Sequence, residues 1–576
     1  MPGQIRHGDA PFSAYAENNP LNRGPAMPVL DDPAAGSLSE RILSLWNSPV
    51  LNRPWFQGLV LAVLAGACAL RAWIGLSGMR NWVHDAFILL DGAWRVRNGQ
   101  VPYNDFFTDI GPLVHVLNSF GLMLARDMPA GLGYAQAVTG LIAGAWAFGL
   151  SRRRFSPAGS VLVTTVVIFL TLAPFDTGNS PTMTSPAMVY NRYGFAFVAL
   201  GLIEAACTRS PVTRLSDFLG GVSTGAIAIL LLFIKVSYFP GLLLLLLLLG
   251  GCRRQTSWRW TGVLAGAAAA FLPFLIYLRW TLAPMWRDLQ MLAGAKHVVR
   301  EWFIAEAVYG SAIPLAVFAF LAFALLSRWG APLEGRRVFI IGLAAGAVGM
   351  FFVPANFPGT RLPLNAVAAV IIVDRVEAYF FARQRSEARS ETRPEAHSEV
   401  MMRCAVLLSG ALFIFVPLFL DATGLGYAVR GRLSAANTAG TAFNEPALAG
   451  FSTFDLNYAY FINDGLALAR QHRRPDDTIV SLDFSNPFSY AFRIRPAWGG
   501  TPMGMQFRTN FDDENHVEAE RLFGHASLVM IPQPQAFSDF SLAANIPRIY
   551  GPSLERHFRL IGETVFWRVY RNNTGY

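Results

Sequence analysis

The chain has 576 residues, of which 53% are hydrophobic and only 15% are charged, and its mean hydropathy is +0.36. A soluble protein carries about a quarter charged residues, so this composition excludes an ordinary soluble enzyme. The net charge of +9 does not indicate a nucleic-acid partner, because the basic residues lie mostly in short loops between apolar blocks. That distribution is typical of a membrane protein with several spans.

The N-terminal segment and the cysteines are uninformative about chemistry. Residues 1–54 are polar, rich in Pro, Gly and Asn, and carry no recognisable cleavable signal peptide, so we expect a disordered cytoplasmic tail. Cys68, Cys207, Cys252 and Cys404 lie inside or at the ends of apolar blocks without metal-type spacing. We expect them to be small buried thiols.

Eleven blocks of the chain are apolar enough to cross a bilayer, which takes about 20 residues each. They are 56–77, 131–150, 158–175, 189–207, 217–235, 238–252, 260–281, 306–327, 337–354, 362–381 and 403–420. We therefore predict an all-α polytopic membrane bundle of about eleven transmembrane helices over residues 55–420. A further apolar segment, 112–125, is short, and we expect it to be a juxtamembrane helix.

Arginine is concentrated in alternate loops, those that follow the second, fourth, sixth, eighth and tenth blocks. By the positive-inside rule these loops face the cytoplasm, and the intervening loops, including the first loop 78–130, face outward. Counting 112–125 as a span would place Arg152, Arg153 and Arg154 on the wrong side. The sequence thus predicts a multi-pass protein of the bacterial inner (cell) membrane, with a cytoplasmic N-terminus.

An odd number of spans places everything after the last one outside. We expect residues 421–576 to form a small periplasmic α/β domain. Segments 478–484 and 527–531 have the composition of buried strands, 565–570 alternates like a further strand, and 458–472 has a helical pattern.

The first outward loop carries four aspartates between two apolar elements: Asp85, Asp91, Asp105 and Asp109. Residues 86–97 have the amphipathic pattern of a helix lying on the membrane surface. Asp85 precedes this helix at the N-cap position, where a carboxylate has a purely local explanation because it accepts hydrogen bonds from free backbone N–H groups. A functional interpretation of Asp85 therefore depends on the rest of the loop.

The whole loop resembles the first periplasmic loop of the GT-C glycosyltransferases, which include the protein O-mannosyltransferases, the aminoarabinose transferases of lipid A and the rhizobial galacturonosyltransferases. Three pieces carry the resemblance: His84-Asp85-Ala86-Phe87, Gly99-Gln100-Val101-Pro102-Tyr103-Asn104-Asp105 and Gly111-Pro112-Leu113. Two positions depart from the pattern. Many members have Asp-Glu where this chain has His84-Asp85, and the usual second proline is Leu113 here. The first departure leaves open whether His84 or a later aspartate takes the second acidic role.

The resemblance implies an inverting glycosyltransferase whose donor is a polyprenyl-phosphate sugar and whose acceptor is a periplasmic glycan, lipid or protein. By this resemblance Asp85 would act as general base on the acceptor hydroxyl or amine, with Asp105 and Asp109 as further catalytic candidates. His84 and Tyr103 are candidate acceptor-side residues of the same loop. Direct displacement forms no covalent intermediate, so no nucleophilic Ser or Cys is expected.

The leaving phosphate requires positive charge near the outer surface. Lys235 is the first candidate, because it lies at the outward turn between the fifth and sixth blocks, where an ionisable group is costly unless it functions. The alternative is that this lysine simply extends to the lipid headgroups. Arg192 and Arg361, at the starts of the fourth and tenth blocks, are further phosphate-binding candidates. Each of them alone also fits an interfacial anchor for membrane lipid.

No metal and no organic cofactor is predicted. Asp85 with Asp105 or Asp109 would offer hard oxygen ligands for Mg²⁺ or Mn²⁺, so a divalent metal stays open. The chain has no Walker phosphate-binding loop, which argues against an ATP-driven pump.

Two other classes of function stay open beside the transferase. A transporter or flippase of a lipid-linked sugar would bind its substrate near the bilayer midplane, and such proteins often contain internal repeats. No repeat is visible here, and the polar residues gather at the outer ends of the spans. A non-catalytic scaffold would not need four aspartates and an amphipathic helix in its first loop. These observations favour the transferase.

Overall fold

The computed structural model describes most of the chain. The described residues are 48, 50, 53–206, 213–250, 256–294, 301–356, 362–387, 397–435, 442–502, 512–533 and 542–573. Arg361, Cys207, Cys252 and most of the predicted N-terminal tail lie outside this set.

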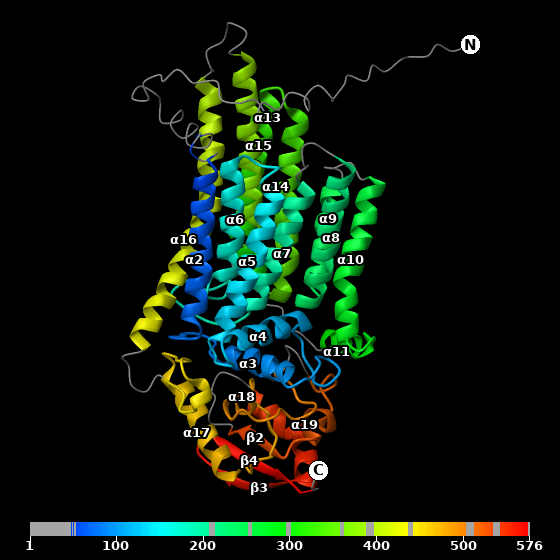
Figure 1. The fold of residues 1–576 in the computed structure, drawn as a ribbon, viewed down its shortest axis with the longest axis vertical. Coiled ribbons are helices and arrows are strands. Elements are labelled where there is room, and N and C mark those ends of the chain that lie inside the picture. Colours follow the sequence, from blue (N-terminus) through cyan, green and yellow to red (C-terminus); the bar gives the residue numbers. More distant parts are fainter. Residues whose placement is uncertain are drawn as a thin grey trace, which may run out of the picture.

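Each of the eleven predicted apolar blocks coincides with a helix or a continuous helical run (Figure 1). These are α2 (Pro54–Ile74), α5 (Gly131–Ser151), α6 (Pro157–Leu172), α7 (Val189–Ala206), α8 (Arg214–Ile234), α9 (Tyr238–Leu249), α10 (Ser257–Tyr277), α12 (Glu301–Ala307) continued by a π-turn into α13 (Ile313–Arg328), α14 (Pro332–Asn356), α15 (Leu364–Glu387) and α16 (His397–Ala435). The predicted multi-pass helical bundle is confirmed. α16 continues to Ala435, so the last long helix reaches into the segment assigned to the C-terminal domain.

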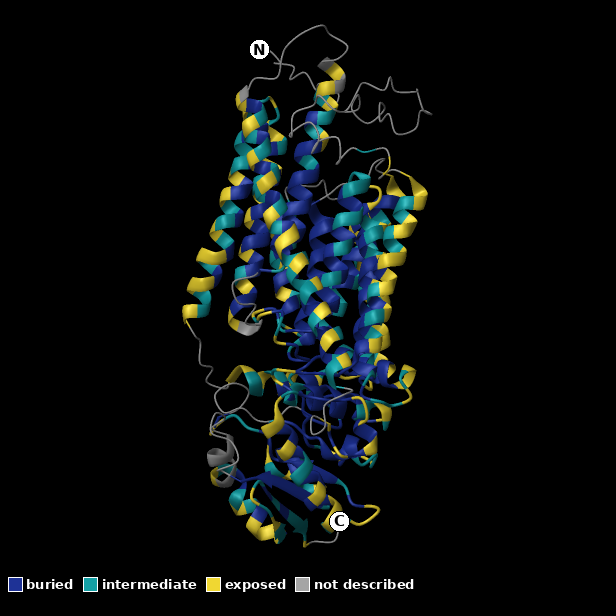
Figure 2. Ribbon diagram, turned by 90° about the vertical axis from the view of Figure 1, so that its left-hand side faces the viewer, coloured by how far each residue is buried: buried dark blue, intermediate teal, exposed yellow. Residues whose placement is uncertain are grey.

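Among the described residues, six of these runs are long and apolar enough to cross a membrane, judged by length and composition alone. They are 54–74, 214–234, 257–277, 301–328, 332–354 and 398–435. The others include the centre of the bundle. Every residue of α7 is buried, and Figure 2 shows the bundle interior as a continuous buried region. A helix that is covered on all sides can carry polar side chains wherever its neighbours satisfy them, so its mean hydropathy falls.

Three short helices lie across one end of the bundle, next to the C-terminal domain (Figure 1). They are α3 (His84–Arg97), α4 (Pro112–Leu124) and α11 (Ala283–Gly294). The placement of α4 agrees with its prediction as a juxtamembrane helix. Pro112 begins α4, where its missing N–H costs nothing.

The C-terminal domain is a small α/β unit with a four-stranded sheet in the order β1-β2-β4-β3. Its elements are α17 (Leu456–His472), β1 (Ile479–Ser481), α18 (Phe488–Ala491), β2 (Leu528–Pro532), α19 (Leu542–His557), β3 (Phe558–Glu563) and β4 (Trp567–Asn572). β1 and β2 are parallel, and β4 is antiparallel to both β2 and β3. The predicted strands and helix are present, and β3 is an additional strand that the sequence did not reveal.

α8 and α10 approach each other through glycines rather than through side chains. A Cβ on Gly221, Gly225, Gly262 or Gly266 would collide with a backbone carbonyl oxygen of the opposite helix. Small residues four apart are a common device for close helix packing in membranes, where no hydrophobic effect drives helices together. The pair is therefore held by backbone contact over two turns.

This packing gives a test of the fold. We expect Gly225→Leu to lower the unfolding temperature, because overpacking costs about 1–3 kcal/mol and the opposing carbonyl of Val263 cannot move aside. Gly66→Leu in α2 is the matched control, because nothing lies within 4 Å of its Cβ position. The measurement is thermal unfolding of both purified variants in detergent, and equal unfolding temperatures would contradict the packing.

Candidate active site

Asp85 is not a helix cap. The helix begins two residues earlier than the sequence pattern suggested, at His84, and the N-cap residue is Val83, which makes no side-chain capping bond. The capping explanation of Asp85 is therefore wrong. The Oδ1 atom of Asp85 lies 3.1 Å from His84 Nε2. Both side chains are partly exposed, that of Asp85 by 16% and that of His84 by 13%. Asp85 is thus a carboxylate at an accessible helix start, with a histidine as its neighbour.

Asp109 supplies a second carboxylate close to Asp85. Its Oδ1 is buried, and no other described residue donates a hydrogen bond to it. Burial raises the pKa of Asp109 to about 6, a shift opposed by the charge of Lys235 and increased by that of Asp85. Because Lys235 and Asp85 both act on Asp109 through their charges, we treat Asp85, Asp109 and Lys235 as one electrostatic group.

Lys235 directly follows α8, at the bundle end where α3 and α4 lie. Its Nζ is 5.3 Å from the ring centroid of Tyr190, at the start of α7. The first loop is fastened beside it, because Gly111 N–H donates to the carbonyl of Ile234 at 3.0 Å. A Cβ at Gly111 would overlap the Phe233 carbonyl, which explains the glycine of the third motif piece.

Two further carboxylates belong to this group. Asp176 lies in the loop between α6 and α7; burial raises its pKa to about 6, opposed by Arg192 and reinforced by Asp85. Asp483 lies in the C-terminal domain; burial also raises its pKa to about 6, opposed by the N–H of Phe484 and by His84. The sequence did not single out Asp176, and it marked Asp483 only as the start of a segment that would either shape an acceptor-binding loop or be an ordinary strand-ending turn.

Asp105 and Tyr103 have structural partners instead. Asp105 forms two hydrogen bonds with Arg279, at 2.8 and 2.6 Å, and accepts a third from Val101 N–H at 2.8 Å. Tyr103 is buried, and its hydroxyl is 3.4 Å from the carbonyl of Ile110. Both residues hold the turn between α3 and α4 in shape, and a catalytic role for Asp105 stays a prediction.

Arg192 is buried and already engaged. It donates to the carbonyls of Phe175 and Leu170 at 2.7 and 3.0 Å, and its Nη1 lies 3.4 Å from Asp421 Oδ1. Together with Asp421 it borders a pocket between α6, α7, α15 and α16. The remaining lining is mainly apolar and includes Val166, Leu170, Leu362, Ala366, Pro417 and Leu418.

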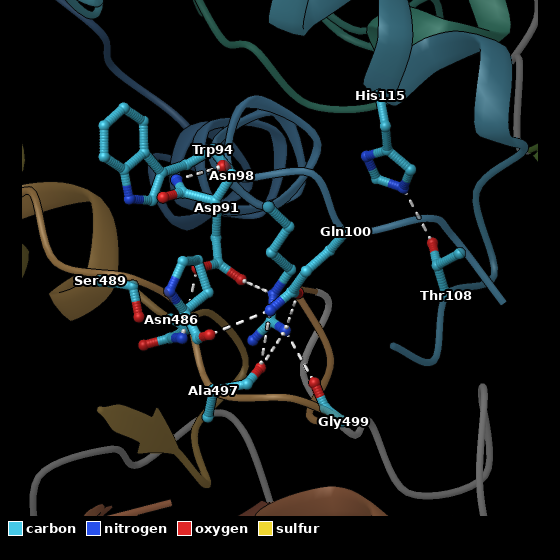
Figure 3. Close-up of polar contacts among 12 residues, drawn as sticks. Asp91, Trp94, Asn98, Gln100, Thr108, His115, Asn486, Ser489, Ala497 and Gly499 are labelled. Atoms are coloured by element: carbon cyan, nitrogen blue, oxygen red, sulfur yellow. Dashed lines mark hydrogen bonds and ion pairs between the residues drawn. The ribbon is translucent and has the colours of Figure 1, made fainter. Parts of the chain in front are cut away.

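The position of α3 is set by a buried charge pair. Arg95 Nε donates to Asp91 Oδ2 at 2.7 Å, and neither side chain has any exposed surface. Arg95 also donates to the carbonyls of Ala497 and Gly499, at 3.1 and 2.7 Å, in the C-terminal domain. Asn486 donates to the other oxygen of Asp91 at 3.3 Å. Figure 3 shows these groups gathered between α3 and the C-terminal loop.

The described ranges contain no group of three or more His, Cys, Asp or Glu side chains placed to hold a metal ion. The acidic residues of the site lie on separate elements of the fold. Lys235 and His84 belong to the same group.

The fold is similar to that of a solved membrane protein. The apo crystal structure of ArnT from Cupriavidus metallidurans aligns with a TM-score of 0.50 at 13% sequence identity, covering 88% of this chain and 97% of that one. A structure of ArnT from Cupriavidus metallidurans bound to undecaprenyl phosphate aligns with a TM-score of 0.44 at 11% identity, covering 90% and 98%. No family model and no curated relative matches the sequence. The chain therefore has a GT-C-type membrane fold, as the first-loop motif predicted.

The Asp91–Arg95 pair gives a second prediction. Arg95→Met leaves Asp91 buried without its counterion, which costs about 3–5 kcal/mol, whereas Asp91→Asn/Arg95→Met should recover much of that loss. The readouts are the unfolding temperature and the protease sensitivity of the C-terminal domain. Arg97→Met is the control, since its pair with Asp127 is about one-third exposed and is worth roughly 0–1 kcal/mol. Equal losses in the single and double variants would contradict the buried pair.

Asp109 gives a third prediction, whose sign follows from its pKa. Because burial raises the pKa above its ordinary value of 3.8, the ionised carboxylate destabilises the fold above about pH 6, and protonation relieves this as the pH falls toward 3.8. Asp109→Asn should therefore raise the unfolding temperature at pH 7.5 and leave it nearly unchanged at pH 4. A lower unfolding temperature at pH 7.5 would show that Asp109 is a structural ion-pair partner instead.

Proposed function

We propose that this protein is a membrane glycosyltransferase that moves a sugar from a polyprenyl-phosphate donor to an acceptor on the outer side of the bacterial inner membrane. The observation that carries the proposal is the electrostatic group of Asp85, Asp109 and Lys235, whose residues belong to the start of α3, the loop before α4 and the end of α8. The GT-C-type fold supports it, because ArnT shares that fold and has itself been crystallised with undecaprenyl phosphate.

In the proposed reaction, Asp85 accepts the proton of the acceptor hydroxyl or amine. The freed lone pair attacks the anomeric carbon of the donor sugar from the side opposite the phosphate. The bond between that carbon and the phosphate oxygen breaks, its electron pair leaves with the lipid phosphate, and the anomeric configuration inverts. The start of α3 suits the base, since the Asp85 carboxylate is partly accessible and makes no capping bond.

Lys235 balances the charge that develops on the leaving phosphate. It lies at the end of α8, at the level where the headgroup of a lipid donor would sit, and its charge acts on the carboxyl group of Asp109. A fixed positive charge in a partly dehydrated site stabilises such a transition state far more than it would in water.

The lipid tail of the donor needs an apolar surface that leads to the site. The pocket between α6, α7, α15 and α16 offers one, and its polar margin is formed by Arg192 and Asp421. Arg192 also raises the local positive charge beside Asp176, within the electrostatic group of the site. We assign this pocket to the first isoprene units of the donor.

The proposed orientation follows from charge. The N-terminus is placed in the cytoplasm and the C-terminal domain in the periplasm, because arginines cluster at the opposite bundle end. There Glu204 pairs with both Arg154 and Arg259, and Arg403 pairs with Glu377. Basic residues at one end of the spans are typical of the cytoplasmic side.

The fourth prediction tests the proposal directly. The purified protein in lipid nanodiscs is given a panel of undecaprenyl-phosphate sugars with total membrane extract as acceptor, and release of free undecaprenyl phosphate is measured. Turnover with one donor is expected, with a loss of about 10²–10⁴-fold in Asp85→Asn and about 10²-fold in Lys235→Gln. Asp127→Asn, in the same loop but paired with Arg97 at the surface, should retain activity.

The outcomes separate the alternatives. Wild-type turnover that survives Asp85→Asn would remove Asp85 as the base. If no donor is consumed, but a labelled lipid-linked sugar changes leaflet only when the protein is present, the protein is a transporter and the transferase proposal fails.

A further inference from the structure

The segment that leads into α3 is fixed along both of its edges. On one edge, Met79 N–H donates to the carbonyl of Ser452 at 2.9 Å. On the other edge, Arg80 N–H and Asn81 N–H both donate to the carbonyl of Thr184, at 2.8 and 3.2 Å. The backbone that presents the next residue, at the entrance to α3, is therefore held in place by two separate parts of the fold.

That next residue is Trp82, which lies three positions before Asp85 in the chain. Trp82 is 42% exposed, and its φ is +47°, in a region that bulky residues rarely adopt. Asp85 N–H donates to the Trp82 carbonyl at 3.1 Å, which fixes the turn into the helix. The large indole is thus presented from a constrained turn beside the proposed base.

The indole of Trp82 is connected to that base through His84. The ring centroids of Trp82 and His84 lie 5.6 Å apart, with their planes at 78°. His84 Nε2 in turn lies 3.1 Å from Asp85 Oδ1. Phe484 packs edge-on against the same imidazole, with centroids 4.6 Å apart. Only the imidazole ring therefore separates the indole from the carboxylate, so an acceptor that meets Asp85 comes close to Trp82.

Polar side chains flank the indole on the same short segment. Arg80 is exposed, and its guanidinium carbon lies 4.6 Å from the centroid of the Phe454 ring. Asn81 is half-buried. A pyranose ring has an apolar face of C–H groups and a rim of hydroxyls, so it fits an aromatic ring with a guanidinium and an amide beside it.

A tryptophan near the end of a span has a simpler explanation as an anchor in the lipid headgroup layer. Trp260 in α10 fits that explanation, because it is 59% exposed on a helix whose Leu264 is 71% exposed. Trp82 differs in its surroundings, because its indole packs on the imidazole next to Asp85. An anchor needs no such contact, whereas a surface that binds the acceptor has to lie beside the base.

We propose that Trp82, with Arg80 and Asn81 beside it, forms the acceptor subsite, and that the acceptor group is a saccharide. Its ring stacks on the indole while one of its hydroxyls meets Asp85. The hydroxyl oxygen forms the new bond to the anomeric carbon, its proton passes to Asp85, and the lipid phosphate leaves with the electron pair of the broken bond. This inference rests on the proposed transferase function and narrows its acceptor to one that bears a sugar.

The binding test requires no donor. Saturation-transfer NMR is recorded on the full-length protein in nanodiscs with the methyl glycosides of glucose, galactose, mannose and N-acetylglucosamine. At least one glycoside should bind, and Trp82→Ala should weaken its binding about tenfold, because the stacking surface is lost. Trp82→Phe keeps an aromatic face and should retain most of the affinity. Trp260→Ala removes an exposed tryptophan at the other end of the bundle and should change nothing.

Three results of the binding test would overturn the proposal. They are the absence of binding to the wild type with all of these sugars, equal binding in Trp82→Ala, and a loss in Trp82→Phe as large as that in Trp82→Ala. The last result would point to damage to the turn before α3 instead of lost stacking.

Turnover separates an acceptor subsite from a purely structural role. With undecaprenyl-phosphate sugar as donor, Trp82→Ala should raise the half-saturating amount of membrane extract about tenfold and leave kcat and the donor KM within about twofold. A loss confined to kcat, or a rise in the donor KM, contradicts the assignment.

Lipid contact is measured separately by fluorescence in nanodiscs made with brominated lipid. The emission of Trp82 is the difference between the wild type and Trp82→Phe, and that of Trp260 is obtained in the same way. Bromine should quench Trp260 and spare Trp82, and equal quenching would make Trp82 an interfacial anchor and overturn the proposal. A wild type that binds a glycoside through Trp82 but consumes no donor would defeat the transferase function alone, so the two failures are distinguishable.

Discussion

The buried charge pair between Asp91 and Arg95 is the interaction on which the site depends. Neither side chain reaches solvent, so each charge must be matched by the other and by fixed dipoles. Arg95 finds those dipoles in the carbonyls of Ala497 and Gly499, and Asp91 finds one in the amide of Asn486. These partners belong to the C-terminal domain, so satisfying the pair fixes the domain against α3. The first turn of the same helix carries His84 and Asp85, whose positions are fixed by the same contacts.

The site itself is built at the expense of local stability. Asp109, Asp176 and Asp483 all have a raised pKa because burial disfavours their ionised forms more than neighbouring groups favour them. A fold selected only for stability would replace such carboxylates with neutral side chains. These three carboxylates lie at one end of the bundle, with Lys235 in the same group. At the opposite end Glu204 and Glu377 are matched by arginines.

The sequence predicted the bundle well because apolar length and arginine parity are each repeated many times along the chain. The apolar blocks in the sequence predicted helices such as α7, although α7 is not among the helices whose length and mean hydropathy alone indicate a membrane span. β3 was missed because only one of its six residues is buried, so it lacks the alternating pattern of a half-buried strand. The sequence drew attention to Asp85, Asp109 and Lys235, whose roles stay predictions, but it could not show that Asp105 pairs with Arg279, 174 residues away. Asp176 had no pattern at all, since the role of an isolated aspartate depends on the residues that pack around it.

The sequence separation within the Arg95 contact has a consequence for biosynthesis. Arg95 belongs to the first helix after the first span, while its carbonyl partner at Ala497 is made 402 residues later. Until Ala497 has been made, the Asp91–Arg95 pair lacks this carbonyl partner and is not covered by the C-terminal domain. A chain cut short before Ala497 would lack the contact, so α3 can reach its final environment only after most of the C-terminal domain has been synthesised.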